Sequence, residues 1–177
     1  MGEQLKTMEA AVQNLTVKRI TDARDLDKIT DWMYGWWGKA EGYAYDAVRC
    51  CMQHSLQTNR LPQTFGLYEG NALIGMYQFT NEDLFPRPDI YPWLANVYLD
   101  PRRRGLGYGR FLLSTVQRSA ASVGLSELYL FTEHTGLYEK FGWTFVETID
   151  TFLQPRLQRL YRLEIGAENN TPTRAGC

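Results

Sequence analysis

The chain has 177 residues, of which 44% are apolar and 22% are charged, a balance typical of a soluble globular protein. The net charge of −1 excludes a global attraction to nucleic acid or to an anionic membrane, and no apolar run approaches the length of a membrane span. The N-terminus lacks the apolar segment of a signal peptide, and Cys50, Cys51 and Cys177 show no zinc-site spacing. We therefore expect one cytoplasmic domain over residues 1–177, with no bound metal.

The N-terminal half is expected to form a strand, two helices and a hairpin. Apolar and polar residues alternate in the strands, whereas apolar residues recur every three or four positions in the helices. The predicted elements are a strand over 15–20, helices over about 21–38 and 44–57, and hairpin strands over 64–68 and 72–79. Thr21 or Asp22 can cap the first helix. Residues 1–13 read as a polar leader.

Three tryptophans lie near the end of the first predicted helix. Trp32 and Trp36 are four positions apart and continue its apolar stripe, so we expect both in the core. Trp37 lies off that stripe and is the better candidate for the wall of a binding pocket.

The C-terminal half follows a polar, proline-containing connector over residues 81–92. The predicted elements are a strand over 93–99, a helix over 107–123, a strand over 126–132, a short helix over 135–141, and strands near 143–150 and 157–165. Residues 166–177 are expected to be disordered. The order of elements predicts a mixed α/β (α+β) fold.

A basic, glycine-rich turn separates the strand over 93–99 from the helix over 107–123. Its arginines bracket its glycines: Arg102, Arg103, Arg104 and Arg110 around Gly105, Gly107 and Gly109. A helix start exposes N–H groups and the positive end of the helix dipole, and glycines allow an anion to approach them. The turn therefore predicts a phosphate or pyrophosphate site. It lacks the Gly-Lys-Ser/Thr of a Walker A loop, and Arg110 stands where a dinucleotide-binding fingerprint requires glycine.

Two motifs together resemble a known family. Arg104-x-x-Gly107-x-Gly109 is similar to the acyl-CoA fingerprint, Gln/Arg-x-x-Gly-x-Gly/Ala, of the GNAT superfamily of N-acyltransferases. Residues 129–132 and 136–143 resemble that family's fifth strand, short helix and Tyr-x-x-x-Gly-aromatic turn. The resemblance is strong over 93–145 and extends over 14–165. It implies a mostly antiparallel, twisted sheet of six to seven strands, flanked by about four helices and splayed at the fourth and fifth strands.

The resemblance implies an N-acetyltransferase that uses acetyl-CoA as co-substrate and transfers its acetyl group directly to a primary amine in a ternary complex. The implied cofactor-binding residues are Val97, Tyr98, Leu99, Arg104, Gly105, Leu106, Gly107, Tyr108, Gly109 and Arg110. Backbone N–H groups near Val97 would stabilise the oxyanion, and Tyr138 would protonate the departing thiolate. Many members carry an asparagine ahead of the short helix, whereas this chain reads Phe-Thr-Glu-His-Thr over 131–135.

The acceptor amine must lose a proton, and the family does not use one fixed base. The candidate bases are Glu82, Asp83, Asp89, Glu133 and His134, of which we select Glu133 and Glu82 as catalytic. We expect the acceptor to be bound by Trp37, Asp83, Asp89, Trp93 and His134.

The carboxylates in this nearly neutral chain predict a cationic small-molecule acceptor such as a polyamine or an aminoglycoside. A protein or peptide acceptor, and a GNAT-like domain that binds acyl-CoA without turnover, are the alternatives. A homodimer is also left open.

Overall fold

The structure is a computed structural model, and it describes residues 14–153 and 155–166. The predictions for residues 1–13, and for 166–177 apart from Gly166, lie outside the described residues. No helix in the described ranges is long and apolar enough to span a bilayer.

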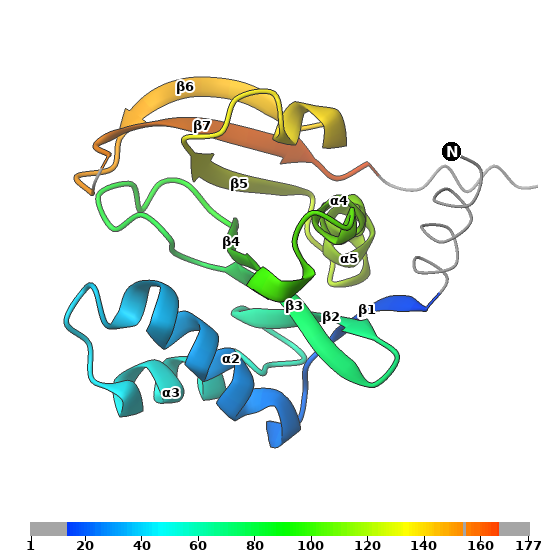
Figure 1. The fold of residues 1–177 in the computed structure, drawn as a ribbon. Coiled ribbons are helices and arrows are strands. Elements are labelled where there is room, and N and C mark those ends of the chain that lie inside the picture. The colour runs from blue at the N-terminus through cyan, green and yellow to red at the C-terminus, as the bar shows by residue number, and fades with distance from the viewer. Residues whose placement is uncertain (1–13, 154, 167–177) are drawn as a thin grey trace, which may run out of the picture.

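Seven strands form one sheet, as Figure 1 shows. They are β1 (Leu15–Arg19), β2 (Gln63–Glu69), β3 (Ala72–Thr80), β4 (Trp93–Leu99), β5 (Glu127–Thr132), β6 (Thr144–Asp150) and β7 (Leu157–Glu164). Their order across the sheet is β1-β2-β3-β4-β5-β7-β6, and only the β4–β5 pair is parallel. The predicted mixed α/β fold with a mostly antiparallel sheet is therefore confirmed.

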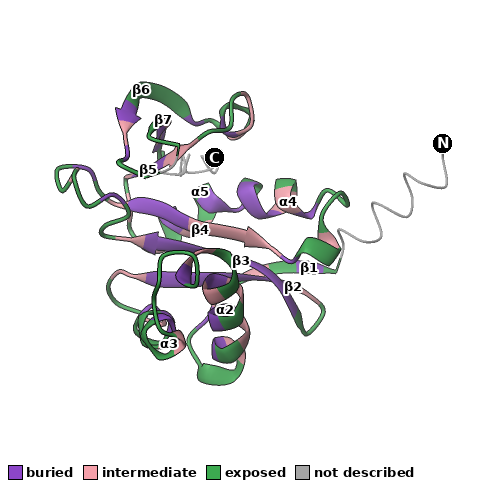
Figure 2. Ribbon diagram, turned by 60° about the vertical axis from the view of Figure 1, so that its left-hand side comes forward, coloured by how far each residue is buried: buried purple, intermediate pink, exposed green. Residues whose placement is uncertain are grey.

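The predicted splay between the fourth and fifth strands is also confirmed. β4 and β5 are paired only at Trp93 and Tyr129, after which the two strands separate. β4 is buried over its first three residues and half-buried over the remaining four, a change that is visible in Figure 2. Among the described residues, the edge of β4 that faces β5 therefore has no strand partner beyond this point.

A bulge in β4 accompanies the splay. Met76 of β3 lies opposite Tyr98, but Gln78 lies opposite Ala95, so β4 holds one more residue than β3 between these pairs. Asn96 lies within the bulge and has a φ of 51°, in the left-handed region that non-glycine residues seldom adopt. A bulge bends a strand, which accounts for the divergence of β4 from β5 while its pairing with β3 continues on both sides of the bulge.

Helices cover both faces of the sheet (Figure 1). On one face lie α2 (Leu26–Met33) and α3 (Tyr45–His54), and on the other lie α4 (Tyr108–Ser114) and α5 (Val116–Ser122). Short 3-10 turns are η1 (Ala23–Asp25), η3 (Pro101–Arg103) and η4 (Tyr138–Phe141), and a π-helical turn is η2 (Tyr34–Gly38).

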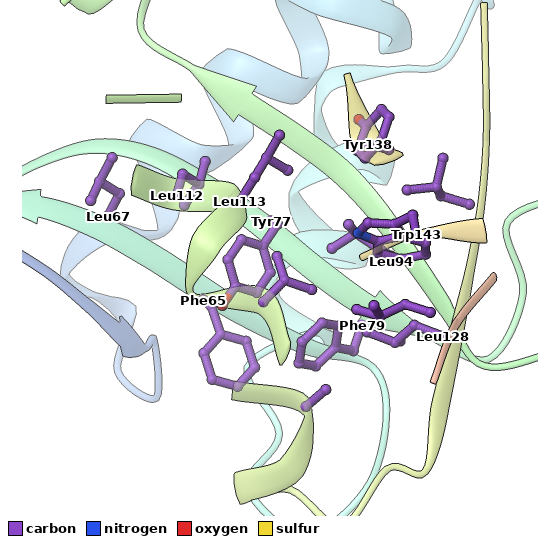
Figure 3. Packing of buried hydrophobic residues seen from close by; sticks show 14 of the residues in the cluster. Phe65, Leu67, Tyr77, Phe79, Leu94, Leu112, Leu113, Leu128, Tyr138 and Trp143 are labelled. Carbon is purple, nitrogen blue, oxygen red and sulfur yellow. The ribbon is translucent and has the colours of Figure 1, made fainter. Parts of the chain in front are cut away.

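Each layer of helices has its own apolar core. The core under α2 and α3 includes Ile29, Met33, Val48, Met52 and Met76. The larger core under α4 and α5 includes the rings of Phe65, Tyr77 and Phe79, which lie against one another in Figure 3. Because alternate residues of a strand point to opposite faces, Met76 and Tyr77 contribute to different cores.

The first predicted helix is divided into η1, α2 and η2, and one expectation for it is wrong. Trp36 is 51% exposed and does not lie in the core. The reason is the π-helical turn, whose wider i→i+5 spacing carries Trp36 away from the apolar stripe that begins at Leu26. Trp32 precedes this turn and is half-buried, with its ring 5.1 Å from that of Tyr98.

The helix predicted over 107–123 is also divided. α4 ends at Ser114 and α5 begins at Val116, with Thr115 between them. The Thr115 hydroxyl donates a hydrogen bond of 2.7 Å to the carbonyl oxygen of Leu112, and the Ser114 hydroxyl donates one of 2.7 Å to that of Phe111. Such hydroxyl bonds compete with the helical backbone and bend it.

Candidate active site

A cavity of about 910 Å³ lies where the splayed part of the sheet meets the α2–α3 layer. Its walls come from η2 and the loop that follows it, α3, the connector after β3, β4, β5 and the β6–β7 turn. Trp37, which the sequence marks as a pocket residue, is half-buried and lines this cavity. Aromatic and carboxylate side chains share the walls, whereas no lysine or arginine is among the described residues that line it.

The structure separates the predicted carboxylates into two groups. Glu82 and Asp83 line the cavity, and Glu41 joins them from the loop after η2. Asp89 is exposed and paired with Arg87, with its Oδ2 atom 2.9 Å from the guanidinium Nη2, and it is not among the lining residues. Glu41 is not among the residues predicted from the sequence, although its position four residues after Trp37 places it in the same segment.

Glu133 and His134 lie outside the cavity wall. Both are exposed in the turn after β5, and neither is among the residues that line the cavity. The backbone N–H of His134 donates a hydrogen bond of 3.1 Å to the hydroxyl of Thr132, which fixes the start of this turn.

Asp83 has the most perturbed carboxyl group of the cavity. Although the residue is exposed to the cavity, the surrounding walls desolvate the carboxyl group and raise its pKa to about 7. Desolvation disfavours the charged form, so the group changes from neutral to charged as the pH rises through neutrality. A carboxylate with this pKa can accept a proton at physiological pH.

Trp37 is held by a chain of side-chain hydrogen bonds that ends in the core. Its indole Nε1 donates to Asn96 Oδ1 over 3.1 Å, and Asn96 Nδ2 donates to Gln78 Oε1 over 2.6 Å. Gln78 Nε2 in turn donates to the hydroxyls of Ser55 and Thr64, each over 2.9 Å. Gln78, Ser55 and Thr64 are buried. These hydrogen bonds therefore connect the bulge in β4 to a buried polar cluster.

Asn96 lines the cavity, although it is not among the site residues predicted from the sequence. The signal that points to it is its position as the one polar residue among apolar neighbours in the strand over 93–99. A polar residue inside a buried strand needs partners, and asparagine tolerates the left-handed conformation better than its apolar neighbours do.

Trp93, predicted to contact the acceptor, is fully buried and does not line the cavity. Its ring packs on Tyr129 and Phe131, with centroid distances of 6.2 and 5.9 Å. Its indole Nε1 has no hydrogen-bond partner within the described part of the chain. Trp93 thus holds together the point at which β4 and β5 are paired.

The glycine-rich turn presents its backbone openly. Gly105 and Gly107 have φ values of 79° and 82°, and a Cβ atom added at either position would meet no atom within 4 Å. Gly107 is the residue at the start of α4. Tyr108 contributes only its backbone to this surface, because its side chain is buried and its hydroxyl donates to Glu69 Oε1 over 2.7 Å.

The arginines of the turn differ in their surroundings. Arg102 is paired with Asp100 and Arg103 with Glu69, at 2.7 and 3.0 Å. Arg104 donates from Nε to the carbonyl oxygen of Leu99 over 3.1 Å, and its guanidinium group lies 5.8 Å from the ring centroid of Tyr98. Arg110 and Leu106 are exposed.

Tyr138 lies in η4 and is 8% exposed, packed against Trp143 and Tyr161. Burial alone raises the pKa of its hydroxyl to about 12. Other buried tyrosines donate to fixed carboxylates: Tyr68 to Asp25, and Tyr161 to Glu139. Because its pKa is about 12, the Tyr138 hydroxyl is protonated at all physiological pH values.

No group of three or more His, Cys, Asp or Glu side chains is placed to hold a metal ion in the described parts of the chain.

The model of the acetyltransferase (GNAT) family matches residues 26–143. The chain belongs to this family, whose members use acetyl-CoA. A search of curated proteins finds no match.

Solved structures share the fold. An aminoglycoside 6'-N-acetyltransferase complexed with coenzyme A is 15% identical, with a TM-score of 0.63 over 86% of this chain and 98% of that one. A spermidine N-acetyltransferase chimera from Vibrio cholerae and hSSAT is 17% identical, with a TM-score of 0.66 over 85% of this chain and 95% of that one. A Salmonella typhimurium enzyme that modifies the N-terminal serine of a ribosomal protein is 12% identical, with a TM-score of 0.63 over 86% and 96%.

The hydrogen bonds and the strain at Asn96 can be separated by two substitutions. Asn96→Gly accepts the left-handed φ but leaves Gln78 Oε1 without its donor, and we expect it to lower the free energy of unfolding by about 1–3 kcal/mol. Asn96→Val loses the same bonds and adds about 1–3 kcal/mol of backbone strain. Urea denaturation measures both. Equal stability of the two variants would show that the bulge does not force this conformation.

Proposed function

We propose that this protein acetylates the primary amine of a cationic small molecule, the class to which polyamines and aminoglycosides belong. The observation that carries the proposal is the cavity beside the splayed strands, in which Glu41, Glu82 and Asp83 lie on the wall with no described cationic side chain. Opposite charge concentrates such an amine at the cavity and orients it.

The glycine-rich turn fits the pyrophosphate of coenzyme A. Its positive-φ glycines leave the backbone open, and the start of α4 directs N–H groups toward the same space. We assign the pyrophosphate contacts to the backbone over 104–110 with the exposed guanidinium of Arg110. The free edge of β4 over 97–99 supplies backbone groups for the pantetheine arm, and the N–H groups near Val97 stabilise the oxyanion.

In the proposed reaction the amine nitrogen forms a bond to the thioester carbon, and the carbon–sulfur bond breaks. The ammonium group first loses one proton to solvent, and Asp83 accepts the second proton, which leaves the nitrogen as the amide forms, directly or through water. Tyr138 gives a proton to the departing sulfur and regains one from solvent, to which Asp83 releases its own. Burial raises the pKa of the Tyr138 hydroxyl to about 12, so this group is protonated and able to donate at physiological pH. Glu82 and Glu133 are the alternative bases.

Gly107→Glu tests the pyrophosphate site. The substitution strains a residue at a φ of 82° and places negative charge where phosphate binds, so we expect at least tenfold weaker acetyl-CoA binding, about 1.4 kcal/mol, in calorimetry. Gly124→Glu is the matched control, since Gly124 has a φ of 79° and equally open surroundings. Equal affinity in the two folded variants would contradict the assignment.

Tyr138→Phe tests the general acid. The ring and its packing remain, so we expect kcat to fall by about 10²–10⁴-fold with little change in the KM for acetyl-CoA. Tyr77→Phe, which removes a hydroxyl from another buried ring, is expected to leave kcat unchanged. Steady-state measurement of thiol release distinguishes them, and a Tyr138→Phe enzyme within threefold of wild type would exclude the role.

Asp83→Asn tests the base through the pH profile. Because a proton must leave the Asp83 carboxyl group before it can accept one from the amine, kcat/KM should rise with pH up to about 7, the pKa of that group. We expect Asp83→Asn to lower kcat and abolish this limb, and Asp89→Asn to preserve it. If Glu82→Gln or Glu133→Gln abolishes the limb instead, that residue is the base.

A further inference from the structure

Four large aromatic side chains stand exposed around the acceptor cavity. Trp36, Tyr43, Phe85 and Phe152 are 51%, 52%, 83% and 64% exposed, and all four line the cavity. We call these four residues the aromatic rim. They come from three segments that are far apart in the sequence, so no single sequence pattern explains their gathering. Exposed apolar side chains that converge on one cavity mark a binding surface.

One residue of the rim is held in an unfavourable conformation. Phe152 has a φ of 59°, which is sterically disfavoured for a bulky side chain. Asn96 and Phe152 are the two non-glycine residues with positive φ in the described chain, and both line this cavity. Strain of this kind persists only where surrounding contacts impose it, and it concentrates at functional sites.

The contacts that impose the conformation of Phe152 lie in the β6–β7 turn. The backbone N–H of Phe152 donates to Asp150 Oδ1 over 2.8 Å, and Arg156 is ion-paired with the same carboxylate. The guanidinium group of Arg156 also lies 5.2 Å from the centroid of the Phe152 ring. The turn is therefore built to keep this ring at the mouth of the cavity although the ring buries little of its own surface.

We propose that the acceptor carries its amine on a flat, apolar body, as an arylalkylamine does. This inference rests on the proposed function and narrows it. The amine reaches the carboxylates Glu82 and Asp83, while the flat body packs between the rings of the rim. A ligand with an apolar body gains from burial against these rings. A polyamine or an aminoglycoside is polar along its whole length and leaves the rim without a partner.

The test compares acceptors at saturating acetyl-CoA, with thiol release as the readout. We expect kcat/KM for tryptamine and 2-phenylethylamine to exceed that for 1,4-diaminobutane, spermidine and kanamycin by at least tenfold. Phe152→Gly removes the ring and relieves the strained φ, so the variant should fold at least as stably as wild type. We expect its Tm to be unchanged or raised, with a KM for tryptamine about tenfold higher and a KM for the diamine unchanged.

Phe152→Trp keeps a ring at the rim and should preserve the KM for tryptamine. Phe145→Ala, which removes an exposed ring of β6 outside the cavity, is the control and should change neither KM. If the polyamine or the aminoglycoside is the better acceptor and Phe152→Gly has no effect, the inference is wrong and the proposed function stands. If none of these amines is acetylated, the proposed function itself fails.

Discussion

The bulge at Asn96 is the constraint on which the rest of the site depends. It offsets β4 against β3 by one residue beyond Ala95, and β4 separates from β5 over the same stretch. The hydrogen bonds of Asn96 to Trp37 and Gln78 connect this irregular backbone to the buried hydroxyls of Ser55 and Thr64. A fully satisfied polar network of this kind rigidifies a core, whereas an unsatisfied one would destabilise it.

The network also couples the two halves of the site. The proposed cofactor groups lie at one end of β4, on its free edge and in the turn that follows, whereas the acceptor cavity reaches β4 at Asn96. A shift of the bulge would therefore move the proposed oxyanion donors near Val97 and the cavity wall formed by Trp37 together. The proposed direct transfer requires the amine and the thioester carbon to be held close together in a fixed orientation. Both binding regions contact the same bent strand, β4, which can fix their relative positions.

Positive and negative side chains also lie in different parts of the proposed site. The turn over 102–110 is basic, but two of its arginines are neutralised by ion pairs. Arg102 pairs with Asp100 and Arg103 pairs with Glu69, and these ion pairs stabilise the turn. The described residues that line the cavity include three carboxyl groups and no lysine or arginine. Desolvation raises the pKa of one of them, Asp83, to about 7. A nearly neutral chain thus presents one surface suited to phosphate and another suited to an amine.

By itself, the sequence determined the elements and their order. The spacing of apolar residues, every second position in strands and every third or fourth in helices, is a local property of the sequence. It located the seven strands, the hairpin and the turn before α4. The glycines of that turn were identifiable because their φ requirement is also local.

Only the tertiary structure decided which side chains meet. Trp36 lies in a π-helical turn and is exposed, whereas Trp93 is buried where β4 pairs with β5. Asp83 lines the cavity whereas Asp89 is ion-paired with Arg87, although both belong to the connector over residues 81–92. Burial, pKa and cavity membership arise from contacts between segments distant in sequence, and local periodicity carries no information about such contacts.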